Sequence, residues 1–165
     1  MADFILYGFG ESGNSYKAAL MLELCGLDYE VRAVDYFGGE TRSEAYRKSI
    51  NPLGEVPVLH HQDKKLTQSG VILDYIAELT GQYGARSNDD RREILRWILY
   101  DNHKFTSYIA TLRFMLQFTP GPEPAVAEFL EQRVTANLKI VNGHLATRDF
   151  ILGGRATIAD VSMCG

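Results

Sequence analysis

The chain has 165 residues, of which 45% are hydrophobic and 23% charged, and its formal net charge is -4. This composition is typical of a globular protein, and the charge excludes a broad basic surface for nucleic acid or anionic membranes. No apolar run approaches the roughly 20 residues that span a bilayer, and the N-terminus lacks a secretory signal pattern. Cys25 and Cys164 form no CxxC pair, so we expect a reducing, cytoplasmic setting and no metal site.

The first eighty residues predict alternating strands and helices. Apolar periodicity and turn residues predict strands at 4–7, 29–35, 56–60 and 65–67, and helices at 15–25, 44–50 and 71–79. Val34 interrupts the alternation of the second strand and suggests that both of its faces are partly covered. The order β-α-β-α-β-β-α predicts an α/β thioredoxin-like domain over residues 1–82, with its first two strands parallel.

After a polar linker, the sequence predicts an all-helical domain from residue 88 to 165. An apolar stripe begins at Ile94 and continues towards Phe118, and a proline-rich turn separates it from a second long helix at 126–145. Thr157–Asp160 has the capping-box pattern that begins a helix. Because that helix starts so near residue 165, we expect the helical domain to be incomplete.

Four segments in fixed order carry a family resemblance: Ser12–Lys17, Asn51–Leu59, Leu66–Ile72 and Thr157–Asp160. In this order and spacing the chain resembles the cytosolic glutathione transferases of the serine type, the bacterial, theta and delta kind. The resemblance covers the whole chain, and the second and third segments together are its most specific part. It implies glutathione as co-substrate and a homodimeric assembly.

The resemblance implies that Ser12 is the catalytic residue. A thiol with a pKa near 8.5 is mostly protonated at neutral pH, and the thiolate is the nucleophile. A hydroxyl donor at a helix N-terminus can stabilise that thiolate. Ser12 could instead be only a helix cap, Asn14 or Ser15 could share the role, and Tyr7 is the activator that tyrosine-type relatives would use.

The same resemblance assigns glutathione-binding roles to two further pairs. Val56 would present its backbone N–H and carbonyl to the cysteinyl backbone of glutathione, because the family has a cis bond before Pro57. Gln68 and Ser69, at the start of the third helix, would hold the γ-glutamyl end. Thr157 and Asp160 are expected to be structural.

Glu55 departs from the family, whose members often have lysine or glutamine there. We count it among the glutathione-binding residues by position, although an acid cannot attract the glycyl carboxylate of glutathione. Arg42 or Lys48 could compensate, and nothing in the sequence decides between them.

The second substrate is expected to be a small hydrophobic electrophile bound between the two domains. The candidate lining residues are aromatic: Phe9, Tyr100, Phe105 and Tyr108, with Phe114 as a further candidate. Aromatic residues at helical spacing are more often core, so each could equally be part of the packing. The lone His103 and the His60–His61 pair lack metal-ligand spacing.

The leading functional prediction is therefore transfer of the glutathione thiolate to an apolar electrophile. Two alternatives remain open: a glutathione-dependent peroxidase or disulfide reductase, and a non-catalytic transferase-like interaction module. The absence of cysteine from the loop at residues 8–14 argues against a mixed disulfide there.

Overall fold

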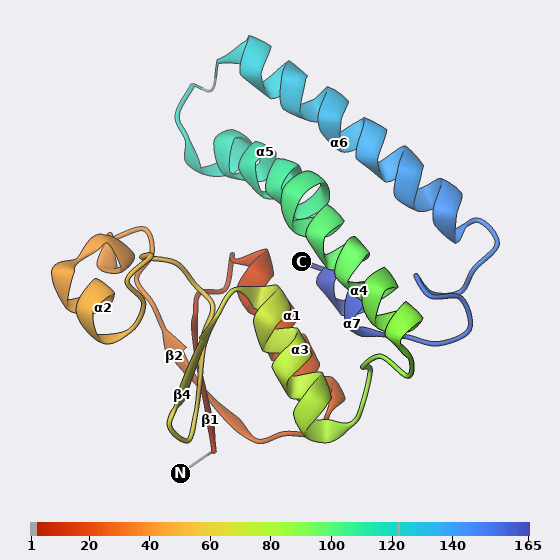
Figure 1. Cartoon of the computed structure of the whole chain (residues 1–165). Helices are drawn as coiled ribbons and strands as arrows, with labels where there is room; N and C mark the ends of the chain where they lie inside the picture. Colours follow the sequence, from red (N-terminus) through yellow and green to blue (C-terminus); the bar gives the residue numbers. More distant parts are fainter. Residues whose placement is uncertain (1–2, 122) are drawn as a thin grey trace. The chain divides into compact units, whose positions relative to one another are not determined.

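The computed structural model of the chain describes residues 3–121 and 123–165. The chain divides into two compact units, residues 1–84 with 164–165, and residues 85–163. The first unit contains a sheet with helices and the second contains helices only (Figure 1). The architecture is thus a thioredoxin-like α/β unit followed by a helical unit, as the sequence predicts.

The sheet of the first unit is mixed and four-stranded, in the order β2-β1-β3-β4. Its strands are β1 (Phe4–Gly8), β2 (Tyr29–Ala33), β3 (Val58–His61) and β4 (Lys64–Thr67). The pair β1 and β2 is parallel, whereas β3 is antiparallel to both of its neighbours. A crossover through α1 (Gly13–Leu24) joins the parallel pair, and a tight turn joins β3 to β4.

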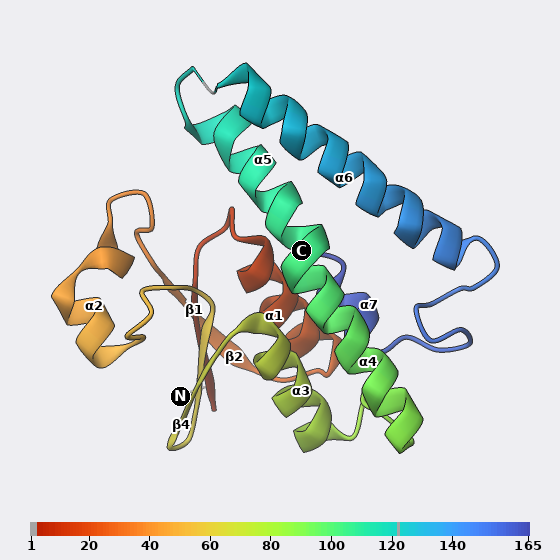
Figure 2. The same cartoon turned by 45° about the horizontal axis from the view of Figure 1, so that its top comes forward.

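Helices α1 and α3 (Ser69–Thr80) lie side by side against the sheet and build the core of this unit (Figures 1 and 2). Both have apolar residues at helical spacing, and their inward faces are buried together with alternate residues of β1 and with Val58 and Leu59 of β3. A 3₁₀ turn, η1 (Glu40–Arg42), and the short helix α2 (Glu44–Ser49) connect β2 to β3. The most deeply buried members of the core are Leu6, Ala18, Met21, Leu22, Val58, Leu59, Ile72, Leu73 and Ile76.

Two details of the sheet differ from the sequence prediction. Strand β2 is an outer strand whose residues 30–33 are exposed, so the expectation that both faces are covered was wrong for the strand itself. Val34 is buried, but it follows the end of the strand. Strand β3 begins at Val58 rather than Val56, because Pro57 has no N–H for a ladder hydrogen bond. The Val56–Pro57 peptide bond is cis.

The second unit consists of long helices around a small core. Helix α4 (Asn88–Tyr100) continues through η2 (Asp101–Phe105) into α5 (Thr106–Phe118), and α6 (Pro124–Leu145) runs back alongside α5 (Figure 2). The short helix α7 (Ile158–Ser162) packs against α4. The core contains Ile94, Trp97, Ile98, Leu130, Val141, Ile151 and Ile158.

The segment η2 is a π-helical turn, which no pattern in the sequence predicted. The Thr106 N–H donates to the carbonyl of Asp101, five residues earlier. The Thr106 hydroxyl also donates to the Asp101 side chain, at 2.5 Å. The Asp101 carboxyl group is fully buried and accepts a second hydrogen bond, at 2.6 Å, from the Ser162 hydroxyl on α7. The wide turn therefore links three helices of the unit through one acidic side chain.

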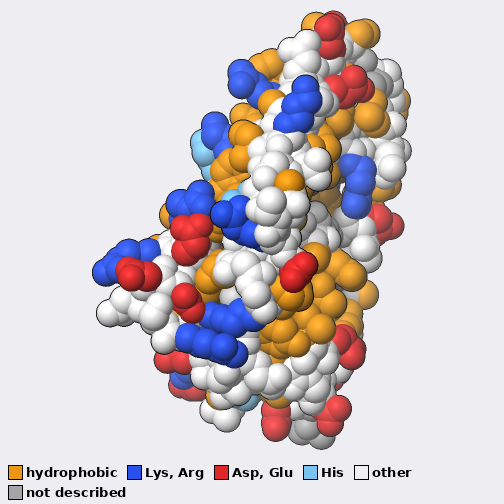
Figure 3. All heavy atoms as spheres, turned by 90° about the vertical axis from the view of Figure 1, so that its right-hand side faces the viewer, with side chains coloured by type: hydrophobic (Ala, Val, Ile, Leu, Met, Phe, Trp, Pro, Cys, Tyr) orange, Lys and Arg blue, Asp and Glu red, His pale blue; other side chains and the backbone are white. Residues whose placement is uncertain are grey.

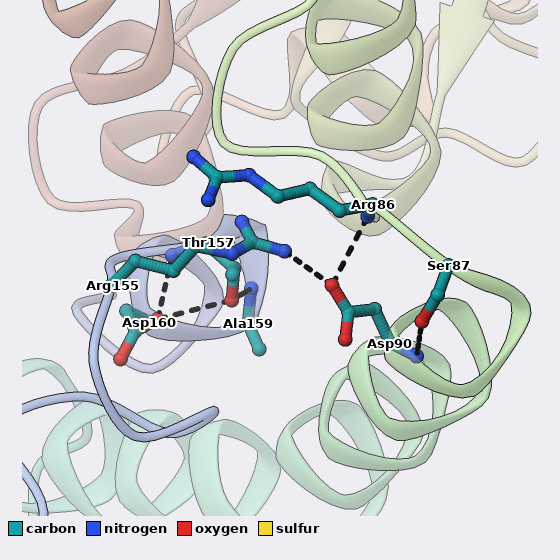
Figure 4. Close-up of polar contacts among 7 residues, drawn as sticks. All are labelled: Arg86, Ser87, Asp90, Arg155, Thr157, Ala159 and Asp160. Atoms are coloured by element: carbon teal, nitrogen blue, oxygen red, sulfur yellow. Dashed lines mark hydrogen bonds and ion pairs between the residues drawn. The ribbon is translucent and has the colours of Figure 1, made fainter.

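A capping box begins α7, as the sequence predicts (Figure 4). The Thr157 hydroxyl accepts from the Ala159 N–H, and the Asp160 carboxylate accepts from the Thr157 N–H at 2.8 Å. The other Asp160 oxygen accepts from the Ile151 N–H at 2.7 Å, which ties the preceding turn to the helix.

A second polar cluster in the same view surrounds the start of α4 (Figure 4). Asp90 accepts from the Arg86 N–H at 3.1 Å and from the Arg155 guanidinium at 2.6 Å. These two contacts, in that order of importance, lower the pKa of the Asp90 carboxyl. The ion pair joins the first helix of this unit to the segment before α7.

We expect the Thr157→Ala variant to lose about 1 kcal/mol of unfolding free energy, because the helix cap is removed while the fold is kept. Urea unfolding followed by circular dichroism measures this change. Thr135→Ala is the matched control, since Thr135 is an exposed residue within α6. If the two variants unfolded at the same urea concentration as the parent chain, the capping box would not stabilise the fold.

Several large hydrophobic side chains remain on the surface of each unit. Figure 3 shows hydrophobic side chains gathered among charged ones on the face in view. Those at least half exposed include Val71 and Leu79 on α3 and Leu95 and Leu99 on α4. Among the described residues, no helix is both long enough and apolar enough to cross a bilayer.

Candidate functional site

Three sequence segments meet at one edge of the sheet. In the strand register, Tyr7 near the end of β1 pairs with Val58 at the start of β3, and Val58 pairs with Thr67 at the end of β4. The loop after β1, the Val56–Pro57 segment before β3 and the Gln68–Ser69 segment after β4 therefore leave the sheet at the same edge. All the glutathione-side candidates are in the first unit, either in these segments or directly beside them: Asn14 and Ser15 are in the first turn of α1, and Glu55 precedes Val56.

Ser12 is the N-cap of α1. Its hydroxyl oxygen accepts from the Ser15 N–H at 3.1 Å, and its backbone carbonyl accepts from Tyr16. A serine hydroxyl has two acceptor lone pairs and one donor hydrogen, so accepting at the cap leaves the O–H able to donate. No acceptor for that hydrogen lies within the described residues. The cap and a donor to an anion are thus compatible at this position.

Asn14 contacts Ser69 across the site, and Ser15 lies deeper. The Ser69 hydroxyl donates to Asn14 Oδ1 at 3.1 Å, which joins the first turns of α1 and α3. The Ser15 hydroxyl is buried and finds no hydrogen-bond partner among the described residues. It lies against Gly8, where an added Cβ would come within 2.6 Å of its oxygen. Only glycine at the end of β1 leaves room for this side chain.

Two buried side chains donate hydrogen bonds to the backbone of the segment before Pro57. The carbonyl of Glu55 accepts from the Tyr46 hydroxyl and from Asn51 Nδ2, each at 3.0 Å. Burial, with a smaller effect of Glu40, raises the pKa of Tyr46 to about 12, so this phenol remains a donor at neutral pH. No hydrogen bond among the described residues engages the backbone N–H or carbonyl of Val56. These groups can pair with an added extended backbone.

The side chains of Glu55 and Gln68 contact each other, a contact that the sequence did not predict. Gln68 Nε2 donates to Glu55 Oε2 at 2.9 Å. Gln68 has φ 69° and ψ 119°, in the region that residues other than glycine rarely adopt. Such strained positions concentrate at ligand sites, and this one lies directly before the N-terminus of α3.

Basic side chains near this site belong to η1 and α2. The Arg47 guanidinium lies beside Gly54, where an added Cβ would be 3.2 Å from Nε and Nη2. The Arg42 guanidinium lies beside Gly39. The sequence singled out Arg42 and Lys48 as cations that could compensate for Glu55, and it missed Arg47, which is one residue from Lys48 and next to the Asn51–Pro57 loop.

The second-substrate candidates are distributed over both units. Phe9 stacks on Tyr36 in the first unit, with ring centroids 4.5 Å apart. In the second unit Phe105 is buried, and the Tyr100 hydroxyl donates to Asn137 at 2.6 Å. The Tyr100 hydrogen bond lies within the helical unit, and Tyr108 is partly exposed. Their assignment to a pocket stays a prediction.

Tyr7, His60 and His61 make ring contacts within the first unit. The Tyr7 ring lies against His60, and His61 stacks on Phe4 and hydrogen-bonds Tyr75. Burial, and secondarily Lys65, lowers the pKa of His60. In the part of the chain that the structure describes, no group of three or more His, Cys, Asp or Glu side chains could hold a metal ion.

Comparison with known proteins agrees with this arrangement. Residues 2–78 match the family model described as glutathione S-transferase, N-terminal domain. The chain is 29% identical to "Glutathione S-transferase 3" of Zea mays, over 98% of this chain and 76% of that protein. It is 31% identical to "Maleylacetoacetate isomerase" of Rhizobium meliloti, over 96% of this chain and 78% of that protein. A crystal structure of a glutathione S-transferase from Pseudomonas fluorescens superposes with a TM-score of 0.91 at 32% identity, over 98% of this chain and 81% of that one. The chain therefore belongs to the glutathione S-transferase family of enzymes.

Proposed function

We propose that the protein conjugates the thiol of glutathione to a small apolar electrophile, in the manner of serine-type transferases. The observation that carries this proposal is the Ser12 hydroxyl, which caps α1 as an acceptor and keeps its donor hydrogen available at the sheet edge. In this proposal the first unit binds glutathione and the second binds the electrophile.

In the proposed mechanism, glutathione binds as an extended strand along Val56. The γ-glutamyl carboxylate is held at the N-terminus of α3 near Ser69, where free N–H groups and the helix dipole favour an anion. The thiol loses its proton to solvent, and the Ser12 O–H with the N-terminus of α1 stabilises the thiolate. The thiolate attacks the electrophile, a carbon–sulfur bond forms, and the leaving group departs without a covalent enzyme intermediate.

The test is the activity of the purified chain with glutathione and 1-chloro-2,4-dinitrobenzene. We expect saturable glutathione binding by calorimetry, release of chloride and formation of the thioether. An organic peroxide in place of the chloroarene tests the peroxidase alternative. Saturable heat of glutathione binding without turnover of either substrate would favour the non-catalytic binding module. The absence of any saturable heat would exclude an enzyme that uses glutathione.

A second candidate function is glutathione-dependent isomerisation of a cis double bond. The observation that favours it is the 31% identity to a protein named maleylacetoacetate isomerase. Isomerisation uses the same thiolate but returns glutathione unchanged, so glutathione would not be consumed. Measuring free thiol during turnover of maleylacetoacetate separates isomerisation from conjugation.

We further propose that the protein works as a homodimer in the cytoplasm and that its electrophiles include compounds to be detoxified. The half-exposed hydrophobic side chains of α3 and α4, named above, support an interface between copies because solvent contact with them is unfavourable. Sedimentation of the purified chain measures its oligomeric state directly.

A further inference from the structure

The hydrogen bond between Glu55 and Gln68 has no function in the chemistry described above. Its partners come from two different segments at the sheet edge, the loop before β3 and the residue before α3. Both residues are exposed, and within the described residues Glu55 forms no ion pair with an arginine or lysine. Its carboxylate is therefore available to a cation from solution.

The chemistry of the pair fixes which atoms remain for a ligand. A carboxylate only accepts hydrogen bonds, so Gln68 must present its NH₂ group to Glu55. The carboxamide oxygen of Gln68 is then left as an acceptor, and Glu55 keeps its other oxygen. Two acceptor groups, one of them anionic, thus lie together. An ammonium group, which has three donors and no acceptor, matches them.

Both partners are attached to firmly held backbone. The Glu55 carbonyl accepts from Tyr46 and Asn51, as described above. The Gln68 carbonyl accepts the first intrahelical hydrogen bond of α3, from the Ile72 N–H at 3.1 Å. The N–H groups at the start of α3, before Ile72, have no acceptor within the helix. Together with the helix dipole they favour the binding of a carboxylate. Ammonium acceptors next to a carboxylate-binding helix terminus suit the zwitterionic head of an amino acid.

We infer that Glu55 is a specificity-determining residue that selects the free α-ammonium group at the γ-glutamyl end of glutathione, with Gln68 as its partner. This inference rests on the proposed function, because it concerns the same tripeptide in the same site. It also gives Glu55 a function other than contact with the glycyl carboxylate. The Arg47 guanidinium lies beside Gly54 in that loop.

The test compares two ligands and three proteins by titration calorimetry. The ligands are glutathione and its analogue in which the α-amino group of the glutamyl residue is replaced by hydrogen. The proteins are the parent chain, Glu55→Gln, and the control Glu78→Gln, which removes the same charge from an exposed position near the other end of α3. Urea unfolding of each protein confirms that stability is unchanged.

We expect the parent chain and Glu78→Gln to bind glutathione about tenfold more tightly than the analogue, as for a hydrogen bond to a charged group. Glu55→Gln should bind glutathione about tenfold more weakly than the parent and should no longer distinguish the two ligands. Unchanged or tighter binding of glutathione by Glu55→Gln overturns the inference, and so does an equal loss for both ligands. If the parent chain binds neither ligand, the proposed function itself is wrong. If the parent chain binds and conjugates glutathione, the comparison with Glu55→Gln tests only the role of Glu55.

Discussion

Replacing Ser12 by alanine should lower kcat/KM for glutathione conjugation by about 30- to 150-fold, because a hydrogen bond to an ionised group contributes about 2–3 kcal/mol. The pKa of the bound thiol should rise towards the value of the free thiol, about 8.5, which thiolate absorbance as a function of pH would measure. The pH at which the rate reaches half of its maximum should rise with it. The activity loss should therefore be largest at neutral pH and shrink in alkaline buffer.

Ser12 also caps α1, so this variant should lose about 1 kcal/mol of stability as well. Ser87→Ala is the matched control, because the Ser87 hydroxyl caps α4 by accepting from the Asp90 N–H at 3.0 Å. The control should lose similar stability and keep its activity. If Ser12→Ala left both the rate and the thiol pKa unchanged, Ser12 would be a cap only, and Asn14 or Ser15 would become the candidate activator.

The Asp101→Ala variant should lose about 3 kcal/mol of unfolding free energy, the largest stability effect that we expect from one polar substitution in this chain. The variant removes the carboxylate that accepts from the buried hydroxyls of Thr106 and Ser162. A buried polar group that loses its partner costs about 1–3 kcal/mol, and here two groups lose it together. Urea unfolding of the purified variant measures the loss.

Two further variants separate this network from a general effect of removing an acid. Asp74→Ala, at an exposed position on α3, should change stability by no more than about 0.5 kcal/mol. Asp101→Ala combined with Ser162→Ala should lose less than the sum of the two single changes, since the same hydrogen bond is removed in both. Strict additivity would show that the Asp101–Ser162 contact contributes nothing.

The order of the helices and strands followed from the sequence because most of its signals are local. Ser12, Ser87 and Thr157 each accept from a backbone N–H two or three residues later, so a short stretch of sequence is enough to predict the cap. Val34 is buried although residues 30–33 of β2 are exposed, and this difference depends on the position of β2 as an outer strand of the sheet. Periodicity within one strand does not carry that information.

The candidate site was predictable only as a set of segments. Their order along the chain predicted a shared role, but their meeting at one edge depends on the register Tyr7–Val58–Thr67. The contact between Glu55 and Gln68 and the contact between Asn14 and Ser69 join residues that are far apart along the chain, so no local pattern marks them. The π-helical turn at η2 was missed for the same reason, because its buried acid is paired with Ser162, 61 residues later.

That turn also changes which sides of the long helical rod face inward. Each residue advances an α-helix by about 100°, so the residue that a π turn adds rotates every later side chain by about that angle. The periodicity of the buried face of α4, with Ile94, Trp97 and Ile98, therefore cannot be extended unchanged through η2 into α5. A helical wheel drawn through α4 and α5 with a uniform period would therefore assign the wrong inward positions in α5. Homologous chains that lack the additional residue should be aligned with a one-residue gap at η2.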